Sequence, residues 1–361
     1  RGYRESLPCR CVGITGSVGK TTTKEMIAAV LRTALRTQWT EKNYNNEIGL
    51  PVSVLRLKPD CEAAVLEMGM NHFGELSVLT RIAQPDLAVI TNIGTMHIEN
   101  LGSREGILRA KLEILEGLRP GGRVIFNGDD ALLRPLAARY HAVCFGLSEG
   151  CDVRASRVCE SAEGSKFTVH AFGKSFEAAL NVPGLHNVLD ALAAAAAGLL
   201  LGLSPEQIAE GLRSYAPLRQ RVSHAAGMTI IDDCYNAGPE SMRAALRVLA
   251  GTPTEGRRIA VLGGMLELGD FAPELHAEVG REAAKTADLL LAYGPCSECY
   301  VQGAHEAGLA GARAFATHDA LVAALEETCR AGDTLLFKGS HGMHMEQVLA
   351  RLLKTKEHMG E

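Results

Sequence analysis

The sequence predicts an α/β protein in which a P-loop doubly wound domain with a small antiparallel sheet is followed by a smaller Rossmann-like domain. Short apolar runs alternate with stretches of helical periodicity along most of the 361 residues, as in parallel sheets covered by helices. A glycine-rich loop joins the first apolar run to the first helical stretch, and the alternation begins again after Pro217. We therefore expect two domains, residues 1–217 and residues 218–361.

The first domain is expected to open with a strand over residues 9–15 and a helix over 21–35, whose apolar side chains recur at helical spacing. Further buried strands and helices then alternate. The strands are expected at 63–67, 87–91 and 123–127, and the helices at 75–82, 103–118, 186–201 and 205–214. The small antiparallel sheet is predicted from three short strands with tight turns between them, at 153–158, 166–172 and 175–182.

The second domain repeats the alternation on a smaller scale, which predicts a complete doubly wound sheet of its own. Its strands are expected at 228–231, 258–262, 289–293 and 334–337. Its helices are expected at 239–250, 273–286, 318–331 and 343–354.

The composition argues against several classes of protein. The net charge of −5 provides no overall basic field, so we expect no nucleic-acid partner. No apolar stretch reaches the roughly 18 residues that a membrane helix needs, so we expect no membrane insertion. The single C-x-x-C, at Cys296 and Cys299, lacks the second pair of a zinc site, and the other cysteines are scattered. Reduced thiols and a cytoplasmic location are therefore expected.

The loop between the first strand and the first helix has the composition of a phosphate-binding P-loop. It reads Thr-Gly-Ser-Val-Gly-Lys-Thr-Thr over residues 15–22. Glycines allow backbone amides to converge on an anion, and the helix N-terminus adds its partial positive charge. The amine of Lys20 can then reach the β- and γ-phosphates of ATP, and the hydroxyl of Thr21 can bind Mg²⁺. The nucleotide-binding residues expected here are Gly16, Ser17, Val18, Gly19, Lys20, Thr21 and Thr22.

Three further ionisable side chains are candidate functional residues. Glu67 ends a predicted strand, where functional residues of doubly wound sheets gather and where a carboxylate can hold Mg²⁺. His97 follows another predicted strand, and Lys111 lies on a predicted helix. Taken singly, each also fits a structural role, as an exposed acid, a surface histidine or a solvated helical lysine.

Polar runs elsewhere suit recognition of a peptide or a sugar. Residues 43–51 read Asn-Tyr-Asn-Asn-Glu-Ile-Gly-Leu-Pro, and asparagine amides offer both donors and acceptors, although they are equally common in turns. Leu-His-Asn at 185–187 opens a predicted helix. Two more runs, at 232–237 and 338–343, read Asp-Asp-Cys-Tyr-Asn-Ala and Lys-Gly-Ser-His-Gly-Met.

Together these motifs resemble those of the Mur ligase family, and the resemblance extends over the whole chain. The shortened loop Thr-Gly-x-x-Gly-Lys-Thr is shared with that family and with folylpolyglutamate synthetases. The resemblance implies catalytic roles for Lys20, Glu67, His97 and Lys111. It implies a Mg²⁺ site made by Thr21, Glu67, His97 and a carbamylated Lys111. Further nucleotide contacts are implied for His186, Asn187, Arg219 (preferred to Arg221) and Asp233. Substrate contacts are implied for Asn45, Asn46, Tyr235, Asn236, Lys338 and Ser340.

The activity implied by the resemblance is ATP-dependent amide ligation. The runs at 43–51 and 232–237 resemble those of family members that join D-alanyl-D-alanine to UDP-N-acetylmuramoyl-tripeptide, through an acyl-phosphate, in bacterial peptidoglycan precursor synthesis. We therefore expect a monomeric bacterial enzyme with ATP, Mg²⁺ and these two substrates as ligands. Two alternatives stay open. One is another amide ligase of the superfamily, of the third-residue-adding, folylpolyglutamate or cyanophycin type, and the other is a nucleotide-binding regulator without ligase activity.

The chain departs from the family pattern at several points. Asp190 stands where a second asparagine is common, Gly264 where an aspartate is usual, and His341 where an arginine is common. The family's separate N-terminal domain, which holds the UDP part of the substrate, does not precede the P-loop in this sequence, which begins without Met and looks truncated or processed. We therefore expect the chain to bind ATP·Mg²⁺ and to be a poor ligase on its own.

Overall fold

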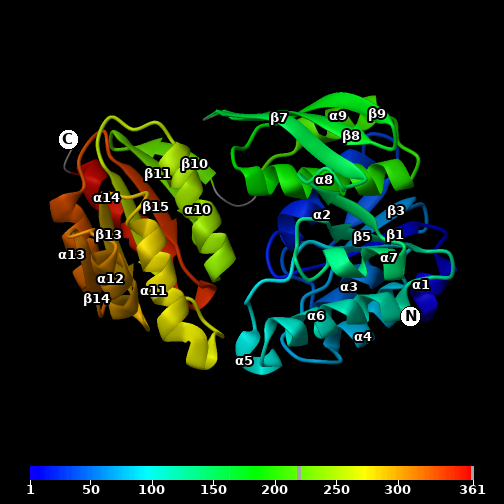
Figure 1. Ribbon diagram of the computed structural model, residues 1–361, viewed down its shortest axis with the longest axis horizontal. Coiled ribbons are helices and arrows are strands. Elements are labelled where there is room, and N and C mark those ends of the chain that lie inside the picture. The colour runs from blue at the N-terminus through cyan, green and yellow to red at the C-terminus, as the bar shows by residue number, and fades with distance from the viewer. Residues whose placement is uncertain (162, 218–220, 359–361) are drawn as a thin grey trace. The chain divides into compact units, whose positions relative to one another are not determined.

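The computed structural model describes residues 1–161, 163–217 and 221–358, and the chain divides into two compact units (Figure 1). Unit 1 runs from Arg1 to Ala216 and unit 2 from Pro217 to Glu361. The division falls one residue before the boundary expected from the sequence. Each unit encloses an apolar core of its own, so each is described by itself.

The P-loop follows a central strand of unit 1. Six strands pair in parallel in the order β2-β3-β1-β4-β5-β6. They are β1 (Arg10–Thr15), β2 (Thr37–Trp39), β3 (Ala63–Glu67), β4 (Leu87–Ile90), β5 (Arg123–Asn127) and β6 (Val143–Gly146). Because β1 lies between β3 and β4, the carboxyl ends of these three strands meet at one edge of the sheet, where doubly wound folds bind their ligands.

The antiparallel part of unit 1 extends the same sheet. It consists of β7 (Val153–Ser161), β8 (Gly164–Ala171) and β9 (Lys174–Leu180). The antiparallel strands predicted as an addition to the first domain are confirmed, and the structure adds that they continue the parallel sheet. Strand β7 pairs in parallel with β6, with Val153 opposite Phe145, because the short connection between them returns the chain to the open edge. The described residues of unit 1 thus form a single sheet of nine strands.

Helices cover both faces of this sheet (Figure 1). One face carries α2 (Lys20–Leu31), α8 (Leu185–Leu200) and α9 (Pro205–Ser214), and the other carries α3 (Gly49–Leu55), α4 (Glu75–Ala83) and α6 (Arg104–Leu112). The alanine run 193–197 of α8 is fully buried. Small residues let α9 approach α2 closely, since a Cβ at Gly211 would lie 2.4 Å from Cα of Val30. The shorter helices are α1 (Gly2–Ser6), α5 (Ile98–Leu101) and α7 (Ala137–Tyr140), with 3₁₀ turns η1 (Glu113–Gly117) and η2 (Arg134–Leu136).

Unit 2 is a smaller sheet between two layers of helices. Among its described residues, six strands lie in the order β10-β11-β15-β12-β13-β14, and only β10 is antiparallel to its neighbour. The strands are β10 (Arg221–Ala225), β11 (Met228–Asp233), β12 (Arg258–Gly263), β13 (Leu289–Tyr293), β14 (Ala312–Phe315) and β15 (Thr334–Lys338). One helical layer holds α10 (Pro239–Gly251), α11 (Ala272–Ala283) and α12 (Ser297–Glu306), and the other holds α13 (His318–Thr328) and α14 (Met345–His358). Two 3₁₀ turns, η3 (Gly269–Phe271) and η4 (His341–Met343), complete the unit.

Two expectations drawn from composition concern the whole chain. In the described parts of both units, no helix is at once long enough and apolar enough to cross a bilayer. All ten cysteines are free thiols, as the scattered spacing predicted.

Candidate functional site

The P-loop (residues 15–22) runs from the end of β1 into the first turn of α2. Gly19 caps this helix at φ 85°, a left-handed conformation that favours glycine. A Cβ at Gly16 would lie 1.8 Å from Oγ1 of Thr91, so only glycine fits against the residue that follows β4. The amine of Lys20 donates to the carbonyls of Gly16 at 2.8 Å and Ser17 at 3.2 Å. The loop therefore has the shape of an anion cradle with a lysine folded over it.

Glu67 ends β3 at the same edge of the sheet and is only 2% exposed. Its Oε1 accepts a hydrogen bond of 2.8 Å from the side-chain amide of Asn45. Its Oε2 is buried and has no hydrogen-bond partner within the described residues. A buried carboxylate oxygen without a partner is costly, and a bound cation would satisfy it.

Lys24 is the positively charged partner of Glu67, and it was not among the residues predicted from the sequence. Its side chain is fully buried, and its amine lies 3.8 Å from Oε2 of Glu67, an ion-pair distance that is too long for a hydrogen bond. The same amine lies 2.9 Å from Oε1 of Glu25 and donates to the carbonyl of Thr40 at 2.7 Å. The signal available in the sequence was its position four residues after Lys20, on the same face of α2.

Lys111 lies on α6 and is 1% exposed. Burial is the main cause that holds the pKa of its amine well below the usual range, and the positive charge of Lys20 lowers it further. The lowered pKa favours the neutral, nucleophilic form of the amine. The role that the resemblance implies for Lys111 stays a prediction.

His97 is half-buried and occupies the first position before α5, at φ 64°. A positive φ is uncommon for a residue with a side chain, and it turns the chain sharply after β4. In the described part of the chain, no three side chains of His, Cys, Asp or Glu gather as a ready metal site. The expected Mg²⁺ site uses only two such side chains, Glu67 and His97, and takes its other ligands from Thr21 and a modified Lys111.

Two expected contact residues of unit 1 have their amides engaged with nearby backbone. The Asn46 carbonyl oxygen accepts from the backbone amides of Ile48 and Gly49, at 3.2 and 2.8 Å, where α3 begins. The amide of Asn187 is 4% exposed and donates to the carbonyl of Pro183 at 2.7 Å. These bonds shape the two loops from which substrate or adenine contacts were expected.

Asp190 sits behind the P-loop, on α8. It is 7% exposed, and its Oδ1 accepts a 2.7 Å hydrogen bond from the hydroxyl of Thr23. A Cβ on Gly19 would lie 2.6 Å from the same oxygen, so the carboxyl touches the loop backbone. Burial raises its pKa to about 8, which makes the carboxyl largely neutral at pH 7.

The candidate residues of unit 2 gather at the carboxyl ends of β11 and β15. Asp233 lies opposite Lys338 in the strand register, and the two side chains form an ion pair of 2.6 Å. The same amine donates to the carbonyl of Asn236 at 2.9 Å. The Ser340 hydroxyl oxygen accepts from the amide of Leu266 at 3.0 Å. Four predicted residues therefore cluster, while Arg219 lies outside the described residues.

The loop after β12 completes this edge of unit 2. A Cβ at Gly264 would lie 3.0 Å from the carbonyl of Pro295, so the glycine allows two loops to touch. Next to it, the amide of Met265 donates to Nε2 of His276 at 2.9 Å. The ring of Tyr235 packs edge-on against that of His341, with centroids 6.0 Å apart.

Comparison with known proteins identifies this combination of units. The model of the Mur ligase middle domain matches residues 14–198, and that of the Mur ligase, glutamate ligase domain, matches residues 219–341. The chain is a member of the Mur ligase family.

Relatives within the Mur ligase family match almost the whole chain. The UDP-N-acetylmuramoyl-tripeptide–D-alanyl-D-alanine ligase of Bacillus subtilis is 40% identical over 98% of this chain and 78% of its own length. The crystal structure of MurF from Acinetobacter baumannii is similar with a TM-score of 0.90 and 35% identity, over 98% of this chain and 78% of that one. The MurF ligase of Thermotoga maritima in complex with ADP has a TM-score of 0.88 and 29% identity, and the match covers 99% of this chain and 83% of that one.

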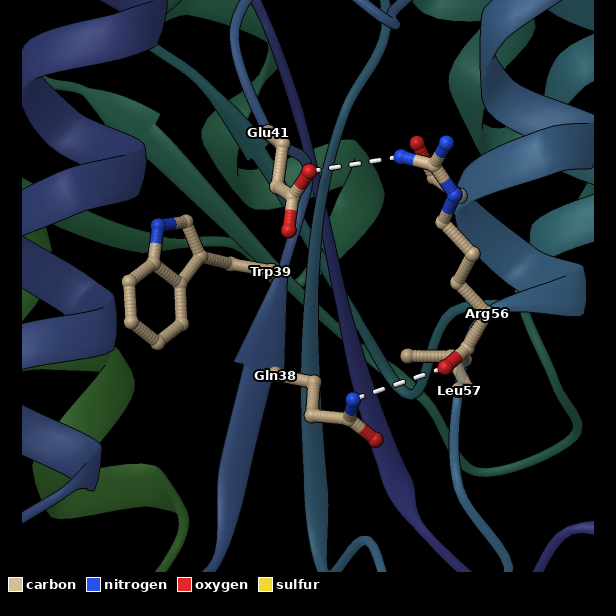
Figure 2. A pocket seen from close by; sticks show the side chains of 6 residues that line it. Gln38, Trp39, Glu41, Arg56 and Leu57 are labelled. Carbon is tan, nitrogen blue, oxygen red and sulfur yellow. Dashed lines mark hydrogen bonds and ion pairs between the residues drawn. The ribbon is translucent and has the colours of Figure 1, made fainter.

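A polar hollow in this Mur ligase lies apart from the predicted site residues. Figure 2 shows it between β2 and α3, with the side chains of Glu41 and Arg56 pointing toward each other at 3.3 Å. Its lining consists of Gln38, Trp39, Glu41, Ser53, Arg56 and Leu57. The hydroxyl of Ser53 is within hydrogen-bonding distance of the carbonyls of Tyr44 and Gly49. It therefore links the lining of the hollow to the amide-rich loop.

Proposed function

We propose that this chain is the ATP-dependent ligase that joins D-alanyl-D-alanine to UDP-N-acetylmuramoyl-tripeptide in peptidoglycan precursor synthesis. The observation that carries the proposal is 40% identity over 98% of the chain to the Bacillus subtilis enzyme of that name. In the proposed reaction the γ-phosphoryl group of ATP passes to the terminal carboxylate of the tripeptide. The amine of D-alanyl-D-alanine then attacks the acyl-phosphate, forms the amide and releases phosphate, while ADP remains from the first step.

The P-loop and Lys20 support nucleotide binding in unit 1. The backbone of the loop and the start of α2 form an anion site, and the Lys20 amine, held by two loop carbonyls, can exchange these for phosphate oxygens. The Thermotoga maritima relative with the same fold was crystallised with ADP. The protein's part in phosphoryl transfer is then mainly to position the reactants and to neutralise charge.

The proposal includes Mg²⁺ held by Thr21, Glu67, His97 and a carbamylated Lys111. The fit rests on Oε2 of Glu67, a buried oxygen without a hydrogen-bond partner in the described structure. When bound, Mg²⁺ reduces the repulsion between the phosphates of ATP and the substrate carboxylate. The bond from Asn45 to Glu67 links the amide-rich loop to this site, so a substrate seated on that loop would lie beside the metal carboxylate.

Carbamylation of Lys111 is proposed because burial and Lys20 favour its neutral amine. The amine nitrogen forms a bond to the carbon of CO₂ and loses a proton, which gives an anionic carbamate able to bind a cation. With ¹³C-labelled bicarbonate we expect one carbamate resonance that is absent in Lys111→Ala, together with loss of ligation in that variant. A matched control, Lys166→Ala, removes an exposed lysine and should change neither result. Ligation by Lys111→Ala at the normal rate would contradict the role.

In unit 2 the proposal assigns nucleotide contacts to Arg219 and Asp233 and substrate contacts to Tyr235, Asn236, Lys338 and Ser340. The support is that Asp233 and the carbonyl of Asn236 contact the buried Lys338 amine, and that the Ser340 hydroxyl lies 3.5 Å from the carbonyl of Ala237 in the same loop. Arg219 lies outside the described residues. We also propose a monomer located in the bacterial cytoplasm, where nucleotide-linked substrates are made. Sedimentation and cell fractionation test these two points.

A phosphate-release assay with a panel of acceptors tests the function. Release should require ATP, Mg²⁺, UDP-N-acetylmuramoyl-tripeptide and D-alanyl-D-alanine together. Release with UDP-dipeptide and a diamino acid would identify the third-residue-adding ligase instead, and release with folate and glutamate would identify the folylpolyglutamate type. Nucleotide binding without release on any pair would identify a regulator.

A further inference from the structure

The segment that follows β4 is bonded to the P-loop through Thr91, Asn92 and Gly94. The amide of Thr91 donates to the carbonyl of Thr15 at 3.0 Å, which extends the β1–β4 ladder by one step. Beyond it, the Ser17 amide donates to the carbonyl of Asn92 at 3.1 Å, and the Gly94 amide donates to the Ser17 hydroxyl oxygen at 2.9 Å. Hydrogen bonds between the P-loop and this segment therefore continue beyond the last paired residues of β1 and β4.

The side chain of Asn92 makes the central contact of this join. Its Oδ1 accepts from the amide of Val18 at 3.0 Å, and its Nδ2 donates to the carbonyl of Val18 at 2.9 Å. Both backbone polar groups of one loop residue are therefore paired with one carboxamide, as a neighbouring strand would pair them. The hydroxyl of Thr91 donates to the same carbonyl at 2.6 Å.

The same segment continues to the candidate metal ligand. Residues 93–97 lead directly from Asn92 to His97, and the Ile93 amide is fixed by a 2.7 Å bond to the carboxylate of Asp130. A shift of Asn92 would therefore move the phosphate loop and the His97 turn relative to each other. Misplacement of reacting groups by about 1 Å is enough to slow phosphoryl transfer strongly.

We propose that Asn92 is a positioning residue, whose carboxamide holds the P-loop in its nucleotide-binding shape and sets its spacing from the His97 turn. The inference rests on the proposed function. This proposal goes beyond that function because it assigns a role to Asn92, whose side chain contacts the backbone of Val18 and is not among the proposed phosphate or metal ligands. Its two contacts are specific to an amide, because a carboxylate cannot donate to Val18 and a shorter side chain cannot reach both groups.

Asn127 provides a matched control. It ends the neighbouring strand β5 and is buried, whereas Asn92 is half-buried. Its amide donates to the Thr91 carbonyl at 3.0 Å, and its Oδ1 accepts from the Asp129 amide at 2.9 Å. The side chain of Asn127 therefore makes two hydrogen bonds to backbone groups, as that of Asn92 does, but neither of them is to the P-loop.

The test measures the affinity of the full chain for ATP without Mg²⁺, by calorimetric titration. The melting temperature of each variant is measured as well. Asn92→Ala should weaken ATP binding by about tenfold or more, since two backbone bonds that shape the loop are lost. Asn127→Ala should lower the melting temperature by a similar amount and leave affinity within about threefold. Asn92→Ser keeps a hydroxyl but cannot span both groups of Val18, and it should show the same loss of affinity if Asn92→Ala does not fold.

The outcomes separate this inference from the proposed function. If folded Asn92 variants bind ATP as the wild type does, or if Asn127→Ala weakens binding equally, the positioning role is overturned while the ligase proposal stands. If the wild-type chain itself binds no nucleotide, the proposed function fails first.

Discussion

Glu67 and Lys24 form a buried pair beside the P-loop, and the pair leaves one carboxylate oxygen unsatisfied. We expect Glu67→Gln to lower Mg²⁺-dependent turnover about 100-fold or more, because the neutral amide removes a charged metal ligand. ATP affinity without Mg²⁺ should change less than about threefold, since the P-loop is untouched. The matched control is Glu25→Gln, which removes the other carboxylate near Lys24. Wild-type Mg²⁺ dependence in Glu67→Gln would show that Glu67 is not a ligand.

Asp190 is expected to make stability depend on pH. Its pKa is about 8 in the folded protein and near 3.8 when the chain is unfolded, because burial disfavours the carboxylate. A raised folded pKa means that its stabilising effect is complete below pH 3.8 and is lost as the pH rises through 8. Asp190→Asn keeps the shape and abolishes the titration. In thermal melts from pH 5 to 9 this variant should gain stability over the wild type toward pH 8, whereas parallel curves would contradict the assignment.

At the scale of single side chains, the sequence predicted those that belong to recognisable motifs. The P-loop and Glu67 lie at the carboxyl ends of the adjacent strands β1 and β3, as their positions after apolar runs suggested, and the roles assigned to them stay predictions. The roles of Asn92 and Thr23 could not be predicted, because their partners are 74 and 167 residues away in the chain. Such pairings arise only when strands and helices are packed.

At the scale of elements, long periodic stretches were predicted well and short or tightly packed ones were missed. Helix 205–214 and strand 289–293 have the predicted bounds. Strand β14 was missed, because its four residues form no apolar run. Helix α12 was also missed, since it is held by close packing on α11 more than by its own pattern. A Cβ at Gly303 would lie 2.0 Å from the carbonyl of Ala277.

The predicted helix over 103–118 is a different kind of error. It ends at Leu112 and continues as the 3₁₀ turn η1. The change coincides with close packing on α4, because a Cβ at Gly117 would lie 2.2 Å from the carbonyl of Thr80. The hydroxyl of Thr80 donates to the carbonyl of Ile114 at 2.6 Å, which fixes the turn. Tertiary contacts of this kind have no counterpart in the periodicity of the sequence.

The loop after β12 depends on the neutral form of His276 on α11. Its Nε2 accepts from the Met265 amide, and its Nδ1 lies 2.6 Å from the carbonyl of Ala272. Burial lowers its pKa below the ordinary 6.5. A depressed folded pKa means that its stabilising effect is present above pH 6.5 and is lost as the pH falls toward the folded value. Between pH 7.5 and 5, wild-type melting temperature should therefore drop more steeply than that of His276→Gln, whose amide can make both bonds without titrating. Equal slopes would contradict this role.

At the scale of the whole molecule, ATP binding is expected to appear as added stability. A ligand that binds only the folded state stabilises it by about 2.7 kcal/mol at a concentration 100 times its Kd. For a unit of this size each kcal/mol raises the melting temperature by about 2–4 °C. The P-loop lies wholly within unit 1, so the calorimetric transition that contains unit 1 should move upward with ATP. Lys20→Ala should fold and lose both this shift and ATP turnover, because the amine that pairs with phosphate is gone. Lys166→Ala, on the exposed side of β8, should keep both. An unchanged shift in Lys20→Ala would place the nucleotide elsewhere, because the stabilisation would then arise without the lysine that closes over the phosphate cradle.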